Sequence, residues 1–302
     1  MHEEYLYVIG GYHPDSSILK DIWRLNTKSN AWETCHVTNL LPSTMASFSL
    51  SQYLSYHMLL FGGTSFPFGH NQSNELYSLF KRDGYFNLVL EKASGDIPPP
   101  CYGSAFISAG DTHYLVGGTT GREYNSHIWK LEKKNSWHWT KLTNETTHLL
   151  PKGRYKHEAF IKETLIFIFG GGSTVDAEPL DKLPVFDTAS KNFITISTSP
   201  DSKYGFPLPR KCFGAVQHEE SVYIIGGCSH DDQKMANVLN DLWRIDLATF
   251  QWTKLEVVLP VGVFFHSASI TPDGWIYIFG GNCDGQSKVR TNIVQRFSIY
   301  ST

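Results

Sequence analysis

The sequence predicts an all-β fold, a six-bladed β-propeller, and three observations support the prediction. A short apolar run that ends in two glycines occurs six times, and the first glycines are Gly10, Gly62, Gly117, Gly170, Gly226 and Gly280. Successive first glycines are 52, 55, 53, 56 and 54 residues apart. A second apolar run with aromatic residues follows each glycine pair. A near-fixed period of about 50 residues with short strands is typical of propellers.

Each repeat is expected to form one blade of four strands, labelled a to d here. In the fifth repeat these strands are residues 212–218, 221–225, 241–246 and 250–255. Strand c is expected again at residues 21–25, 75–79, 127–131, 183–187 and 293–297. Strand d carries an aromatic residue at Trp32, Phe86, Trp139, Phe193 and Trp252.

The paired glycines and the aromatics of strands c and d have different expected roles. Glycine permits a positive φ and a close approach of backbone where strand b leaves the sheet. The aromatics are expected to pack one blade on the next. Aromatic residues make up 14% of the chain, which suits such a fold.

The first and last repeats are expected to be incomplete. The sequence begins at strand b of the first blade and stops after strand c of the sixth, so 22 strands are expected. Closure of a propeller removes exposed sheet edges. We therefore expect the full protein to be longer at both ends.

Composition narrows the functional classes. The 302 residues could form two domains by length alone, but the repeat favours a single domain over residues 1–302. The net charge of −3 gives no general attraction to nucleic acid or anionic lipid. No apolar run is long enough for a transmembrane helix.

The cysteines and the first residues indicate a reducing compartment. The five cysteines are odd in number and form no Cys-x-x-Cys pair, so neither a disulfide framework nor a zinc site is expected. Residues 1–4 do not resemble the start of a secretory signal. We expect a protein of the cytoplasm, with the nucleus as a further compartment.

The strongest functional signal lies on the loops. In an antiparallel blade the d-to-a segments and the b-to-c loops lie at the same end of the channel, its mouth. Five cations gather on the d-to-a segments: Lys152, Arg154, Lys156, Arg210 and Lys211. Aromatics are expected around them: Tyr102, Tyr155, Phe66, Phe68 and Phe264. A cationic mouth with aromatic walls suits a small anionic group on an extended chain.

Enzyme motifs are missing from the sequence. It has no Gly-x-Ser-x-Gly, phosphate loop or His-Glu-x-x-His motif. A copper radical oxidase would need clustered Tyr, His and Cys ligands, and Cys101, Tyr102 and His266 are too few. We therefore expect a non-catalytic protein with no cofactor and no metal.

The repeats jointly resemble the kelch repeat family over the whole chain. Segments 61–69, 153–158, 205–212, 247–255 and 265–274 are similar to kelch proteins that act as substrate receptors of cullin-2 RING ubiquitin ligases. That resemblance implies binding of C-terminal degrons, which are protein tails ending in small residues such as Gly or Ala. Elongin B/C and cullin-2 are implied as partners only for a longer chain, because the family's elongin-binding helix and cullin box follow the propeller.

The resemblance also implies roles for the mouth residues. The carboxylate of the tail would be held by Arg154, Arg210 and Lys211. The last residues of the tail would be lined by Tyr102, Tyr155, Phe264, His266, Phe66 and Phe68.

Alternative roles remain open for several of these residues. Kelch repeats often carry an Arg and a His near strand a that bond loop backbone, so Arg154 with His157 could be structural. Arg210 has Phe213 at the His position, and both roles stay open for it. His266 is more often a packed channel residue than a ligand. Phe66 and Phe68, around Pro67, indicate a contact surface.

A second hypothesis is a general kelch scaffold that binds an internal motif or a folded partner, for example in stress signalling or the cytoskeleton. The two hypotheses differ in one respect. A receptor of C-termini loses binding when the tail is amidated, whereas a scaffold need not.

Overall fold

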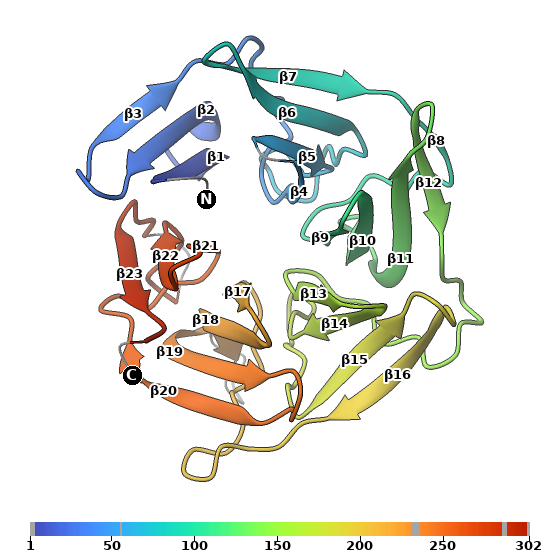
Figure 1. Cartoon of the computed structure of the whole chain (residues 1–302), viewed down its shortest axis with the longest axis vertical. Helices are drawn as coiled ribbons and strands as arrows, with labels where there is room; N and C mark the ends of the chain where they lie inside the picture. Colours follow the sequence, from blue (N-terminus) through green and yellow to red (C-terminus); the bar gives the residue numbers. More distant parts are fainter. Residues whose placement is uncertain (1–3, 55, 231–235, 286–288, 301–302) are drawn as a thin grey trace. The chain divides into compact units, whose positions relative to one another are not determined.

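The computed structural model describes residues 4–54, 56–230, 236–285 and 289–300. These residues form 23 strands in six sheets, and no helix occurs among them. Each predicted repeat corresponds to one sheet, so the fold is the predicted six-bladed β-propeller (Figure 1). Among the described residues there is accordingly no helix able to cross a membrane.

The strands of the first three blades are as follows. Blade 1 contains β1 (Tyr5–His13), β2 (Ser17–Asn26) and β3 (Trp32–Cys35). Blade 2 contains β4 (Ser49–Leu54), β5 (His57–Phe61), β6 (Leu76–Arg82) and β7 (Tyr85–Glu91). Blade 3 contains β8 (Ala93–Gly95), β9 (Ala105–Ala109), β10 (Thr112–Thr119), β11 (Tyr124–Lys133) and β12 (Trp137–Lys141).

The strands of the other three blades follow the same order. Blade 4 contains β13 (Glu158–Lys162), β14 (Leu165–Phe169), β15 (Lys182–Asp187) and β16 (Asn192–Ser197). Blade 5 contains β17 (Gly214–His218), β18 (Ser221–His230), β19 (Ala236–Asp246) and β20 (Trp252–Val258). Blade 6 contains β21 (Ser267–Ile270), β22 (Trp275–Phe279) and β23 (Val294–Ser298). The described residues of blades 1 and 6 thus form three-stranded sheets, as expected.

The chain divides into two compact units. The first comprises Met1–Tyr155, Ile161–Ile166 and Asp187–Phe193, and it holds blades 1 to 3. The second comprises Lys156–Phe160, Phe167–Phe186 and Ile194–Thr302, and it holds blades 5 and 6.

The paired glycines are required by contacts with the following blade. Gly170 has a φ of +52°, and a Cβ built on it would lie 2.5 Å from the carbonyl oxygen of Arg210. The N–H of Gly171 donates to that same oxygen at 3.0 Å. In blade 2, the carbonyl of Cys101 lies 2.5 Å from a Cβ built on Gly62 and accepts from the N–H of Gly63 at 2.9 Å. The pair therefore marks the point where one blade bonds to the next.

The strand d aromatics are buried in four of the five predicted positions. Phe86, Trp139, Phe193 and Trp252 are each exposed by 2% or less, whereas Trp32 is 38% exposed. The indole N–H of Trp252 donates to the carbonyl of Leu180 and to the hydroxyl of Thr198, in the preceding blade. The predicted packing of blade on blade is confirmed there, and burial of Trp32 is not observed.

The linkers between blades add backbone pairing that the sequence did not predict. β8 lies in the linker after β7 and pairs in parallel with β12, the outer strand of the next blade. Single parallel bridges repeat this arrangement at Val37↔Phe86 and Ser199↔Gln251. The prediction of 22 strands is therefore one short of the 23 among the described residues, because a three-residue linker strand has no alternating pattern to reveal it.

Two predicted strand starts were wrong by two residues, for a common reason. Strand a of blade 5 begins at Gly214 and not at residue 212, because Cys212 has a φ of +56°. Strand d begins at Trp252 and not at residue 250, because Phe250 also has a φ of +56° and closes a turn on Asp246. A left-handed residue cannot continue an extended strand.

Candidate functional site

The loops of the mouth pair with one another by a repeated backbone bridge. In blade 3, Tyr102 and Thr119 exchange two hydrogen bonds of 3.0 Å. In blade 5, Lys211 and Cys228 exchange bonds of 3.0 and 2.9 Å. Each bridge joins a d-to-a segment to the residue just after the paired glycines of the same blade, in β10 and in β18. The prediction that the d-to-a segments and the b-to-c loops share one end of a blade is therefore confirmed.

The residue after the bridge has a left-handed conformation in every described case. We call these five residues the mouth positions, and their φ angles lie between +53° and +65°: Ser47, Gly103, Lys156, Cys212 and Phe265. In the first unit, Gly103 N–H donates to Ser47 at 2.9 Å. In the second, Cys212 N–H donates to Lys156 at 3.0 Å, and Phe265 N–H donates to Cys212 at 2.8 Å. A bonded backbone, and not a loose loop, therefore presents these side chains.

The first unit carries an aromatic patch, in which Phe66 and Phe68 are exposed and Tyr12, Tyr102 and Tyr155 are half-buried. Phe66 and Phe68 are 52% and 45% exposed, and their rings lie 5.3 and 4.8 Å from the ring of Tyr12. Tyr102 and Tyr155 meet edge to face at 6.2 Å.

The two halves of the aromatic patch are neighbours. A Cβ built on Gly69, next to Phe68, would lie 3.3 Å from the hydroxyl of Tyr102. The loop that carries Phe66 and Phe68 therefore packs directly against the Tyr102 side of the patch.

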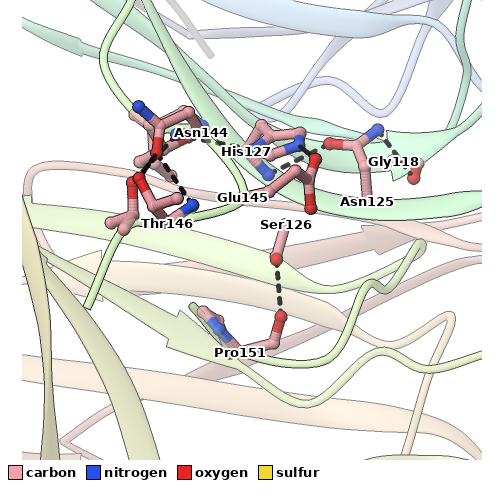
Figure 2. A network of polar contacts seen from close by, with 11 residues as sticks. Gly118, Asn125, Ser126, His127, Asn144, Glu145, Thr146 and Pro151 are labelled. Atoms are coloured by element: carbon pink, nitrogen blue, oxygen red, sulfur yellow. Dashed lines mark hydrogen bonds and ion pairs between the residues drawn. The ribbon is translucent and has the colours of Figure 1, made fainter. Parts of the chain in front are cut away.

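The segment leading into Arg154 and Tyr155 is fixed by polar contacts (Figure 2). Ser126 donates to the carbonyl of Pro151 at 2.6 Å, and the backbone N–H of Arg154 donates to Asn125 at 3.0 Å. His127 contacts Glu145 at 2.9 Å and Thr143 at 3.2 Å. These contacts hold the segment on β11, so Tyr155 is presented from an ordered support.

Arg210, predicted to contact a ligand, is fully buried and engaged internally. Its guanidinium donates to the carboxylate of Asp241 at 2.7 and 3.0 Å, to Gly226 at 3.1 Å and to Leu208 at 3.1 Å. Burial acts to raise the pKa of Asp241, but the hydrogen bonds and charge of Arg210 outweigh it and the pKa is lowered. The geometry favours the structural alternative for Arg210.

Arg154 and His266 also make bonds typical of structural residues. Arg154 is 4% exposed, and its Nε donates to Lys152 two residues earlier, as Arg210 donates to Leu208. The Nε2 of His266 accepts from the N–H of Gly214 at 3.0 Å. Burial lowers the pKa of His266 to about 4, so the ring is neutral at pH 7.

Lys211 and Phe264 are buried beneath the surface of the mouth. The ammonium of Lys211 donates to the carbonyls of Ser173 and, at 3.0 Å, of Thr174, and so holds the b-to-c loop of blade 4. Phe264 is 3% exposed and packs against two cysteine side chains. Neither side chain is presented to a ligand in this conformation.

Lys156 differs from the other predicted cations. It is half-buried at a mouth position, and its ammonium lies 5.4 Å from the centre of the Phe265 ring, which is 44% exposed. Burial lowers the pKa of this ammonium and raises the pKa of Glu158, two residues later, to about 7. Lys156 and Phe265 therefore form a cation with an aromatic wall in the second unit.

The sequence prediction overlooked Phe265 and Tyr12. Phe265 could have been found by aligning the repeats on the start of strand a, which gives it the same position as Lys156. Tyr12 offered no comparable signal, because its place beside Phe66 depends on how two blades pack.

Comparison with known proteins identifies the class. The KLHDC2/KLHL20/DRC7 Kelch-repeats domain matches residues 1–227 and 139–301, so the chain belongs to this family of kelch-repeat propellers, a protein-binding and typically non-catalytic fold.

Individual relatives agree with the predicted resemblance. Kelch domain-containing protein 10 of Rattus norvegicus is 33% identical over 298 residues, which cover 95% of this chain and 70% of the rat protein. The Homo sapiens protein of the same name is 33% identical over 298 residues and is covered to 65%. Its Drosophila melanogaster homolog is 29% identical over 311 residues, which cover 92% of this chain and 50% of the fly protein.

Proposed function

We propose that this chain is the substrate-recognition propeller of a cullin-2 ubiquitin ligase and binds C-terminal degrons, tails ending in small residues such as Gly or Ala. Elongin B/C and cullin-2 would be partners of a longer chain that includes it. The proposal extends the family membership of the chain to a specific ligand.

The observation that carries the proposal is the aromatic patch of the first unit, with its exposed Phe66 and Phe68. Large aromatic side chains exposed by about half indicate a contact surface when they lie together. Two rigid χ angles allow such rings to contact a peptide at low cost in conformational entropy. Phe66, Phe68, Tyr102 and Tyr155 of the first unit would contact the peptide.

The carboxylate of the tail needs a cation with a free donor. Arg210 and Lys211 already donate to protein acceptors, so we assign the carboxylate to Lys156, which follows Tyr155 in the chain. A charge-assisted hydrogen bond contributes roughly 1.5–3 kcal/mol. Phe265 beside this ammonium would limit the room for the last side chain and so favour Gly or Ala.

Matched fluorescent peptides that end in a free Gly carboxylate or in its amide test the proposal. Loss of a charge-assisted bond should weaken binding of the amide by about tenfold to a hundredfold. Fluorescence anisotropy with the native chain measures both affinities. Equal affinities for acid and amide would favour the second hypothesis, a scaffold that binds internal motifs.

A further inference from the structure

Two buried cysteines lie side by side in the second unit. Cys212 and Cys228 are each 3% exposed, and they form one packed cluster with Phe264. Each has a free thiol. Because the two cysteines come from different mouth segments of blade 5, a bond between them would join those segments covalently.

The backbone holds the two thiols in register. Cys228 exchanges two hydrogen bonds with Lys211, the residue before Cys212. Residues paired in this way have Cα atoms about 5.5 Å apart, and Cys212 is the next residue along the chain from this pair. Because both side chains already pack in one cluster with Phe264, a disulfide between them needs only a local adjustment of the Cys212 segment.

The surroundings activate one of the two thiols. The hydrogen bond from Cys212, with help from the nearby Lys211 ammonium, lowers the pKa of Cys228. Burial raises the pKa of Cys212, which therefore remains a protonated donor. A thiol of lowered pKa beside a second thiol is the arrangement that two-step oxidation to a disulfide uses.

We propose that Cys212 and Cys228 form a peroxide-reactive pair that is oxidised to an intramolecular disulfide. The Cys228 thiolate attacks one peroxide oxygen, the O–O bond breaks, and a sulfenic acid and hydroxide form. The Cys212 sulfur then attacks the sulfenic sulfur, and the Cys212 proton leaves with the hydroxyl as water. In total, two thiols and one hydrogen peroxide give one disulfide and two water molecules.

The oxidation state of this cysteine pair can affect the mouth, because Cys212 is itself a mouth position that bonds to two others. Cys212 accepts from the N–H of Phe265 and donates its own N–H to Lys156. A disulfide therefore fixes the mouth position whose backbone bonds to both Lys156 and Phe265. This consequence for tail binding rests on the proposed function, whereas the disulfide itself does not.

Treatment of the native chain with hydrogen peroxide, followed by intact-mass measurement, tests the pair. We expect the mass to fall by two hydrogen atoms and to recover with dithiothreitol. Glu219 and Glu220 lie between the two cysteines, so a Glu-specific protease separates them. Fragments that carry Cys212 and Cys228 and stay joined until reduction would identify the bond without any variant.

Substitutions supply the controls. Cys212→Ser and Cys228→Ser should each abolish the mass loss. Cys101→Ser should retain it, because Cys101 is equally buried but contacts Ser104 and not a second cysteine. Addition of oxygen without loss of hydrogen, or a disulfide that survives either substitution, would overturn the proposal. Tail affinity measured on the oxidised chain distinguishes failure of the proposed function from failure of the disulfide.

Discussion

At the scale of single residues, the predicted cations of the mouth have two different roles. Arg210 and Lys211 bond to other parts of the protein, whereas Lys156 is the cation that we assign to the ligand. Arg210 takes its carboxylate partner from 31 residues away, and Lys211 takes a carbonyl from 37 residues away. The sequence singled out the segments that carry these cations, but such distant partners are set by tertiary packing and leave no local pattern. Only their residue type was predictable, and residue type alone does not distinguish the two roles.

Replacing Arg210 tests its structural role. Arg210→Ala leaves Asp241 buried without its ion partner, so we expect a loss of about 3–5 kcal/mol in the free energy of unfolding. Arg24→Ala is the matched control, because the exposed Arg24–Glu33 pair should contribute only about 0–1 kcal/mol. Urea unfolding of both variants measures the difference. Similar small losses would show that Arg210 is available for a ligand.

The raised pKa of the Glu158 carboxyl predicts that the stability of the fold depends on pH. Burial raises its pKa to about 7, so between its usual pKa and 7 the folded chain holds a proton that the unfolded chain has lost. The contribution of Glu158 to stability therefore falls as the pH rises through this window. Glu158→Gln should have nearly native stability at about pH 5 and exceed it at about pH 8. Parallel stability curves for the two proteins would contradict the buried, protonated carboxyl.

At the scale of elements, the fold was largely predictable because its signal is local and repeated. Three of the glycine pairs directly follow the end of a strand and three lie at a register shift inside β1, β10 and β18, and every predicted blade is observed. Two strands of blade 5 were predicted to start at Cys212 and Phe250, which is two residues too early. These non-glycine residues adopt a left-handed φ that the sequence does not reveal. β8 was missed because its pairing depends on the adjacent blade.

A comparison of two glycines separates backbone conformation from blade contact. Gly170→Ala and Gly110→Ala both place a side chain at a φ between +50° and +60°, which costs about 1–2 kcal/mol. Only the Gly170 side chain would also collide with a carbonyl, that of Arg210 at 2.5 Å, while Gly110 has open space. We expect Gly170→Ala to lose several kcal/mol more in unfolding free energy. Equal losses would rule out the contact as the reason for the paired glycines.

The loop that carries Phe66 and Phe68 is expected to contribute directly to peptide affinity. Phe66→Ala should weaken binding of an acid-ended tail by about tenfold, as for an aromatic at the centre of an interface. Tyr85→Ala is the control, because Tyr85 is 50% exposed but follows the turn at the other end of its blade. Titration of one peptide with both variants tests this. Equal effects would remove the aromatic patch from the site.

At the scale of the whole molecule, the family to which the chain belongs is established, whereas its ligand is proposed. Six repeats, the match to kelch-repeat domains and the relatives agree on a protein-binding propeller. Sequence and fold do not specify the tail, because one kelch framework supports many ligands through its loops. The aromatic patch of the first unit and the Lys156–Phe265 pair of the second are the features that distinguish this chain.

The most direct test of the central claim measures the acid-to-amide affinity ratio in the native chain and in Lys156→Met. Our account predicts a ratio of about 10 to 100 for the native chain and a ratio near one for the variant. Lys134→Met, which removes an exposed cation from a turn between strands c and d, should keep the native ratio. A ratio that is unchanged in Lys156→Met would contradict the assignment of the carboxylate to this mouth.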